Sequence, residues 1–288
     1  MVKISSLFGQ GPTMSFEFFP PKDEQGEESL YRAVEALRPC RPSFVSVTYG
    51  AGGGTRDRTL GLVVRIQREL GLTSMAHLTC VGSRKGEIRD LLRRLHDDGI
   101  QNILALRGDP PKGEKEFKPP DGGFRHARDL VAEIRETGLD FCVGVAGYPE
   151  GHVETPDLDQ DLAHLGSKVA AGADFLITQL FFDNQDYWAF VRRCRSAGID
   201  VPIVPGLIPV TNVAQIQRFT RMCGARIPNE LRRRLAIVER DPAAVVATGV
   251  HWSVEQGRDL LRDGAPGLHF YTLNRSSATL AVHAALGV

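Results

Sequence analysis

The feature that most constrains the fold of this 288-residue chain is a regular spacing of short apolar segments rich in β-branched and aromatic residues. These segments recur at roughly thirty-residue intervals, which is the length of one strand followed by one helix. Amphipathic stretches such as Arg56–Leu70 and Gln185–Ser196 separate them. The segments predicted to be strands are Met14–Phe19, Phe44–Thr48, Ser74–Cys80, Asn102–Leu106, Asp140–Val145, Asp174–Phe181, Val201–Pro205 and Leu268–Thr272.

Strands that alternate with helices predict a parallel sheet, and eight such units predict a closed (β/α)8 TIM barrel of the α/β class. An open doubly wound sheet is the structural alternative. The interval before the last strand holds extra helical segments, at Asn212–Cys223, Asn229–Val238 and Pro242–Asp263. Because no linker divides the chain, we expect residues 1–288 to form one domain.

Charge and cysteine content narrow the class of protein. Lys plus Arg equals Asp plus Glu at 35 each, which argues against a nucleic-acid surface or a polybasic membrane surface. No apolar run approaches the ~18 residues that span a bilayer, and the N-terminus has no signal-peptide pattern. Five scattered cysteines without a C-x-x-C pair predict reduced thiols, no metal site and a cytoplasmic location.

Glu17 is the first candidate for chemistry. In the segment Ser15–Pro21 the two-residue period of a strand places Phe16 and Phe18 on one face and Glu17 on the other. A carboxyl group surrounded by phenylalanines is expected to have a raised pKa and to donate a proton near neutral pH. A buried ion pair with an arginine is the equally weighted alternative.

Asp109 is the second candidate, because it follows an apolar strand directly and precedes Pro110. Gly108 beside it permits close approach of a ligand to the main chain. An Asx turn that ends the strand explains the same residues without a site.

The glycine-rich run Gly50–Gly54 follows a strand, but it does not match a dinucleotide-binding fingerprint because Thr55 replaces the third glycine. Thr55 is expected instead to cap the next helix. His77 near the end of a strand is either a core histidine or a ligand contact.

Further polar residues lie where loops and helices follow the predicted strands. Tyr148 and His152 share a loop, and Asp161, His164 and Lys168 share one helical stripe. For each group a plain surface role is an alternative to ligand binding. Gln179 interrupts an apolar strand, so its amide is expected to bond either a substrate or the neighbouring backbone.

Taken in order, several of these motifs resemble those of the 5,10-methylenetetrahydrofolate reductase family. The matching segments run from about residue 14 to the C-terminus and include Ser15–Pro21, Val47–Gly53, His77–Cys80, Ala105–Asp109, Tyr148–Glu150, Ile177–Gln179, Pro205–Pro209 and His269–Arg275.

The resemblance implies a flavin-dependent oxidoreductase with non-covalent FAD that reduces methylenetetrahydrofolate to methyltetrahydrofolate with NADH or NADPH, in one-carbon metabolism and methionine biosynthesis. It implies a catalytic barrel of the bacterial type and a homo-oligomer. Glu17 and Asp109 would be catalytic. The implied FAD contacts are Thr48, His77, Arg107, Gly108, Asp109, Ala127, Tyr148, His152, Asp161, His164 and Lys168. The implied contacts to folate or nicotinamide are Glu17, Gln179, Gln215, Phe219 and Arg275.

The resemblance also implies a ping-pong cycle in which Glu17 protonates the bridging nitrogen of the folate, and Asp109 stabilises the iminium that forms. Around Lys112–Phe124, and at His126, His164 and Ser167, the chain departs from the family pattern, so the contacts to adenine and phosphate are open there. A folate-dependent methyltransferase barrel without a flavin, and a non-catalytic flavin- or folate-binding subunit, are the alternative functions.

Overall fold

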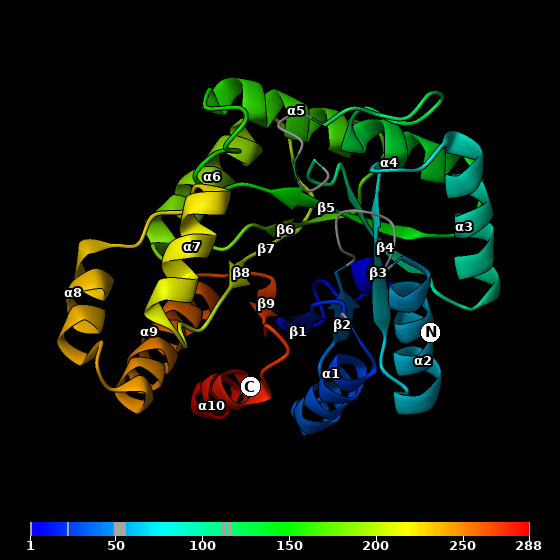
Figure 1. Ribbon diagram of the computed structural model, residues 1–288. Helices are drawn as coiled ribbons and strands as arrows, with labels where there is room; N and C mark the ends of the chain where they lie inside the picture. The colour runs from blue at the N-terminus through cyan, green and yellow to red at the C-terminus, as the bar shows by residue number, and fades with distance from the viewer. Residues whose placement is uncertain (1, 22, 49–55, 111–112, 114–116, 288) are drawn as a thin grey trace.

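The computed structural model describes residues 2–21, 23–48, 56–110, 113 and 117–287, and it is a barrel of parallel strands surrounded by helices (Figure 1). The glycine run Gly50–Gly54 and its expected cap Thr55 lie outside the described residues. Neighbouring strands follow the order β7-β6-β5-β4-β3-β2-β1-β9-β8. The (β/α)8 barrel expected from the spacing is therefore confirmed.

Every predicted strand segment overlaps an observed strand. The bounds are β1 Thr13–Phe18, β2 Phe44–Val47, β3 Ser74–Thr79, β4 Asn102–Leu106, β5 Cys142–Gly147, β6 Phe175–Thr178, β7 Ile203–Val204, β8 Gly206–Leu207 and β9 Gly267–Tyr271.

Strands β7 and β8 are two halves of one strand that Pro205 interrupts, because proline has no backbone N–H to donate to a ladder. β7 pairs with β6, and β8 pairs with β9, so the interrupted strand closes the ring. Gly206 is required at the break, since a Cβ there would lie 2.3 Å from the carbonyl oxygen of Thr178. An open doubly wound sheet is excluded by this closure.

Helices cover the outside of the ring, and three of them precede the last strand as expected. The bounds are α1 Glu24–Leu37, α2 Arg56–Leu70, α3 Lys85–Asp97, α4 Ala127–Glu136, α5 Leu158–Ala170, α6 Asn184–Ser196, α7 Val213–Cys223, α8 Asn229–Val238, α9 Pro242–Arg262 and α10 Ser276–Leu286, with 3-10 turns η1 Ile4–Ser6 and η2 Arg38–Cys40. None of the helices in the described ranges is both long and apolar enough to cross a membrane.

The predicted alternation along β1 is confirmed. Phe16 and Phe18 are fully buried in the large apolar cluster between strands and helices, while Ser15 and Glu17 point into the barrel. Burial of each phenylalanine stabilises the fold by about 1.5–3 kcal/mol. The face that carries Glu17 is thus left for polar side chains.

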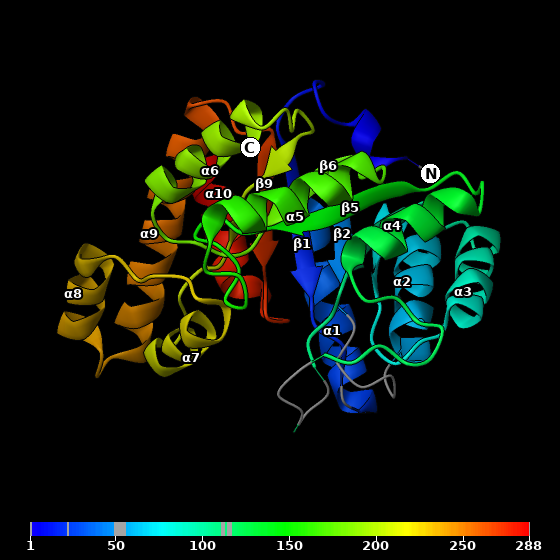
Figure 2. The same ribbon diagram turned by 90° about the horizontal axis from the view of Figure 1, so that it is seen from above.

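The N-terminal turn η1 closes the end of the barrel where the strands begin, a feature that the sequence analysis did not predict. Ile4 is fully buried against residues from the starts of neighbouring strands, including Phe44 and Phe175. Its backbone N–H donates to Oδ1 of Asn102 at 2.8 Å. Figure 2 shows this segment at the end of the barrel from which β1 points away, so the opposite end is left for a site.

Candidate active site

Four polar side chains from four adjacent strands meet inside the barrel near the carboxyl ends of the strands. Glu17 comes from β1, Thr48 follows β2, His77 comes from β3 and His269 from β9. These strands are direct neighbours in the order β3-β2-β1-β9, so side chains far apart in sequence are brought into contact. This end of a (β/α)8 barrel is where such enzymes place their active sites.

The carboxylate of Glu17 is the centre of this group. Thr48 Oγ1 donates to Glu17 Oε1 at 2.8 Å, and His269 Nε2 lies 3.1 Å from Oε2. His77 Nε2 lies 3.4 Å from the same oxygen, which is beyond a normal hydrogen bond. Glu17 and both histidines are almost completely buried. A single carboxyl group is therefore held by three polar neighbours with little access to solvent.

The pKa of Glu17 is lowered, so the expectation of a raised pKa is wrong for the ligand-free protein. Burial is the largest influence and acts to raise the pKa, but the combined effects of His77, His269 and Thr48 outweigh it. The physical reason is orientation, because Phe16 and Phe18 point away from the carboxyl group. In place of the expected phenylalanines, Glu17 faces hydrogen-bond donors, and it is ionised at neutral pH.

His269 has a hydrogen-bond partner on each ring nitrogen. Its Nδ1 lies 2.9 Å from Ser15 Oγ, and the Ser15 hydroxyl also lies 3.2 Å from the carbonyl oxygen of Leu268. When Glu17 is ionised, His269 Nε2–H donates to it and Nδ1 accepts from Ser15. When Glu17 is protonated, its O–H donates to Nε2, Nδ1–H donates to Ser15, and Ser15 donates to Leu268. A neutral His269 thus satisfies both protonation states of Glu17 by changing tautomer.

His77 differs from His269 because neither of its ring nitrogens has a hydrogen-bond partner within the described part of the chain. Burial lowers the pKa of His77, and the charge of Glu17 opposes that change only in part. Burying a polar group without a partner costs about 1–3 kcal/mol. The imidazole of His77 beside the Glu17 carboxylate is therefore a candidate for contact with a bound molecule.

A second group of residues begins where β4 ends. Arg107 pairs with both carboxylate oxygens of Glu154, with Nη2 to Oε1 at 2.8 Å, and its guanidinium lies 5.7 Å from the ring centroid of Phe117. Gly108 follows with φ of +85°, and a Cβ there would lie 2.6 Å from Cγ2 of Val81. No other residue fits this left-handed position without displacing a strand neighbour.

The loop after β5 and helix α5 bring four more predicted residues together. The rings of Tyr148 and His152 are 4.6 Å apart, and Lys168 Nζ lies 5.9 Å from the Tyr148 centroid while donating to the carbonyl oxygen of Ala146 at 2.6 Å. Burial lowers the pKa of Lys168 to about 8, against the opposing charge of Asp161. Burial is also the main reason that the pKa of His152 is lowered and that of Asp161 is raised.

Three predicted cofactor residues lie at the edge of this second group. Asp109 is exposed, and after burial its charge is the next influence that raises the pKa of Tyr148. Among the described contacts Asp109 makes no hydrogen bond to Glu17, so the two carboxylates are separate features. Ala127 is the first residue of α4, and His164 is exposed on α5.

The predicted substrate residues lie on the loop after β6, on α7 and at the start of α10. Gln179 Oε1 accepts from the backbone N–H of Leu180 at 2.9 Å, which confirms the backbone alternative for its carbonyl oxygen. Gln215 and Phe219 are half-buried on α7, and Phe219 packs on the apolar cluster that also includes Tyr271. Arg275 is exposed.

A tight turn joins β9 to Arg275 at the start of α10. Leu273 and Asn274 both have left-handed φ values, 51° and 59°, which is costly for leucine. Asn274 offsets the cost by bonding both the N–H and the C=O of Phe19, at 2.8 and 2.9 Å. The loops after β1 and β9 are thereby held together beside the site.

Ser15, His269 and Glu154 are site residues to which the sequence analysis gave no role. His269 and Ser15 share the inward face of β9 and β1, and the register pairs them directly. The two-residue period would have placed both inward, but only closure of the barrel makes β1 and β9 neighbours.

Comparisons with known proteins agree on one family. A sequence model of the family described as "Methylenetetrahydrofolate reductase" matches residues 4–287. The chain is 41% identical over 275 residues to "5,10-methylenetetrahydrofolate reductase" of Escherichia coli K12, covering 96% of this chain and 90% of that protein. It is also 41% identical to "Methylenetetrahydrofolate reductase (NADH) 1" of Arabidopsis thaliana, covering 99% of this chain. The chain spans 50% of that plant relative.

Solved structures with a similar fold are more distant in sequence. One is a Clostridium thermocellum protein described as binding two copies of 5-methyl-5,6,7,8-tetrahydrofolic acid, with a TM-score of 0.61, 15% identity, and coverage of 96% of this chain and 94% of that one. Another is a phosphonopyruvate hydrolase, with a TM-score of 0.53, 12% identity, and coverage of 99% and 82%. These similarities support the barrel fold alone.

Proposed function

This chain belongs to the methylenetetrahydrofolate reductase family, and we propose that it catalyses the FAD-dependent reduction of 5,10-methylenetetrahydrofolate to 5-methyltetrahydrofolate with NADH or NADPH. The observation that carries the proposal is the buried carboxyl group of Glu17, held by Thr48 and His269 at the carboxyl ends of the strands. The reaction needs a proton donor that is shielded from water, and this group supplies one.

Proton transfer is the part of the reaction that these residues perform. The five-membered ring of the folate must open to an iminium before it accepts a hydride, and opening requires a proton on the bridging nitrogen. We assign that proton to Glu17. Because Glu17 is ionised in the ligand-free protein, its pKa must rise when the reactants bind for it to act as the acid.

His269 and Ser15 support this role by holding the carboxyl group of Glu17 in place. The change of tautomer described above keeps the hydrogen bond between His269 and Glu17 in both protonation states of the carboxyl group. His269 is therefore a positioning residue, acting on the folate only through Glu17.

The side chains present suit FAD. His77 has two buried nitrogens without a partner among the described residues, and Arg107 and Lys168 place two cations beside the aromatic ring of Tyr148. Arg107 and Lys168 would bind the phosphates, Thr48 and His77 would contact the ring system, and Tyr148 and His152 would pack on the ligand. When bound, FAD supplies the hydride transfer, taken from NAD(P)H and passed to the folate in a ping-pong order.

The remaining predicted residues have roles toward the reactants. Asp109 would stabilise the cationic iminium by its negative charge. The Gln179 amide N–H groups make no hydrogen bond within the described residues, so they are free to bind the pterin or the nicotinamide. Phe219 would stack on the benzoyl ring of the folate, and Gln215 and Arg275 would bind its polar end.

We further propose that the whole chain works as one catalytic domain, in the cytoplasm and as a homo-oligomer. The test is direct product analysis of the purified protein supplied with FAD, methylenetetrahydrofolate and either NADH or NADPH. Formation of methyltetrahydrofolate with oxidation of the nicotinamide supports the proposal. A protein that binds folate and gives no product with either donor would contradict it.

A further inference from the structure

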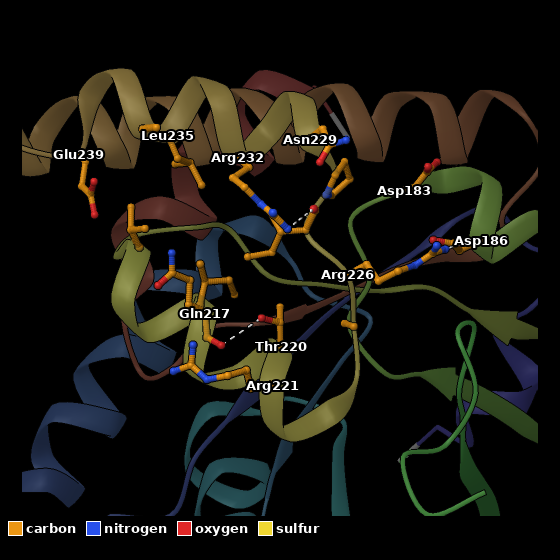
Figure 3. A pocket seen from close by; sticks show the side chains of 16 residues that line it. Asp183, Asp186, Gln217, Thr220, Arg221, Arg226, Asn229, Arg232, Leu235 and Glu239 are labelled. Carbon is orange, nitrogen blue, oxygen red and sulfur yellow. Dashed lines mark hydrogen bonds and ion pairs between the residues drawn. The ribbon is translucent and has the colours of Figure 1, made fainter. Parts of the chain in front are cut away.

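A separate cavity of about 730 Å³ lies between α7 and α8, beside the start of α6 (Figure 3). This volume is within the roughly 300–1,000 Å³ typical of small-molecule sites. Among the described residues that line the cavity, none belongs to the candidate active site.

The floor of the cavity is apolar. It is lined by Ile216, Ala225, Ile227 and Leu235. The first two and Leu235 belong to the apolar cluster that α7 and α8 share, and Ile227 packs against that cluster. A floor of this kind contributes affinity for the apolar part of a ligand, about 25 cal/mol per Å² of area removed from water.

Three arginines line the same cavity, and only one of them is neutralised. Arg226 bonds Glu150 at 2.8 Å and Asp186 at 2.7 Å. Within the described part of the chain, Arg221 and Arg232 make no ion pair, and Arg232 has only a 3.4 Å contact to the carbonyl oxygen of Ile227.

Three described acidic side chains also line the cavity, and none of them forms an ion pair with Arg221 or Arg232. Asp183 accepts from the backbone N–H of Gln185 at the start of α6, and Asp186 is paired with Arg226. Glu239 lies at the far end of α8 from Asn229, as Figure 3 shows. Gln217 and Asn229 add neutral hydrogen-bonding groups.

We propose that this cavity binds a small organic anion that has an apolar body and a terminal carboxylate or phosphate. The apolar body rests on the floor, and Arg221 and Arg232 bind the charged end, since guanidinium groups pair well with either anion. The site lies outside the reaction centre, so the ligand is an effector.

Helix α7 connects this site to the reaction centre. Gln217 and Thr220 lie on the side of α7 that lines the cavity, and with 3.6 residues per turn Gln215 and Phe219 lie on the opposite side. A ligand that packs against α7 therefore shifts or rigidifies the two residues assigned to the folate. This regulatory consequence rests on the proposed reductase function, whereas binding itself does not.

Binding is tested by ligand-observed NMR titration of the FAD-saturated protein with phenyl phosphate, benzoate and, as a neutral probe, benzyl alcohol. We expect at least one of the two anions to bind, and the neutral probe to bind at least tenfold more weakly. The double variant Arg221→Gln/Arg232→Gln should bind the anions at least tenfold more weakly. Ala236→Phe places a large side chain in the cavity from an exposed position on α8, and it should weaken binding to the same extent. Arg240→Gln, an exposed arginine outside the cavity, is the matched control and should bind as the wild type does.

The relative affinity of the two anions identifies a phosphorylated or a carboxylated ligand class. Absence of binding by both anions, or equal affinity in all variants, would overturn the proposal. Because binding is measured without turnover, this result is independent of whether the reductase proposal holds. In a turnover assay the bound anion should change KM for the folate in the wild type and in Arg240→Gln, with no change in the double variant.

Discussion

His269 Nε2 lies 3.1 Å from Glu17 Oε2, and the other nitrogen of the same ring lies 2.9 Å from Ser15 Oγ. Glu17 and His269 are 252 positions apart in the chain, and the pairing of β1 with β9 brings them together. This pair makes Glu17 a carboxyl group that keeps a hydrogen bond whether it is ionised or protonated. The first prediction follows from that property.

Replacing His269 with phenylalanine exchanges the imidazole for an apolar aromatic ring that has no nitrogens. We expect the folate half-reaction to slow by about tenfold to hundredfold, since the carboxyl group of Glu17 loses the hydrogen bond that positions it. Flavin reduction by NADH should be nearly unchanged. Stopped-flow absorbance measures the two half-reactions separately, with Ser15→Ala as the milder variant that leaves Nε2 in place. Equal slowing of both halves would show a structural role for His269.

Thr48→Val removes the hydroxyl that donates to Glu17 at 2.8 Å and keeps the shape of the side chain. That hydrogen bond is one of the influences that lower the pKa of Glu17. Its loss raises the pKa, so the protonated acid persists to higher pH. The alkaline limb of the pH profile for the folate half-reaction should therefore move upward, while Thr48→Ser should restore the wild-type profile. A pH profile that does not move in Thr48→Val would show that Thr48 does not influence the pKa of the group that acts as the acid.

Lys168 is expected to make FAD affinity depend on pH. Its pKa of about 8 means that the ammonium loses its charge as the pH rises through that value, and with it the attraction to a phosphate. The dissociation constant of FAD should rise above pH 8 by up to about tenfold per pH unit. Fluorescence titration at several pH values measures this. Lys168→Arg stays charged, so its affinity should be almost independent of pH between 8 and about 10.

Gly249 and Gly61 form a matched pair of helical glycines for a stability test. A Cβ at Gly249 on α9 would lie 1.9 Å from the carbonyl oxygen of Val210, whereas a Cβ at Gly61 on α2 meets no atom within 4 Å. Gly249→Ala should lower the free energy of unfolding by about 1–3 kcal/mol. Gly61→Ala should raise it by up to about 1 kcal/mol. Urea unfolding measures both, and a tolerated Gly249→Ala would mean that α9 is less closely packed than described.

Regular spacing of apolar segments was sufficient to predict the barrel, because a strand and a helix repeat at a nearly constant interval. The helices inserted before the last strand were also predicted, and the predicted bounds Asn229–Val238 match those of α8. The break at Pro205 was not predicted, because a run of apolar residues does not show which partner each half pairs with.

The site was predicted in part. Strand alternation placed Glu17 inward, and the barrel places Tyr148, His152 and Lys168 together as the resemblance implied. The direction of the Glu17 pKa was wrong, because the sequence shows the neighbouring phenylalanines but not the histidines that face it across the barrel. For the same reason the contact with His269 was missed, since it exists only once the ring is closed.

The most direct test of the account is the anaerobic stopped-flow comparison of wild type with Glu17→Gln, which keeps the size of the side chain and cannot donate the proton. We predict that NADH bleaches the flavin band of both proteins at similar rates. We predict that methylenetetrahydrofolate then restores the band about 10²–10⁴-fold more slowly in the variant. Restoration at the wild-type rate in Glu17→Gln would contradict the assignment of Glu17 as the acid and with it the central claim.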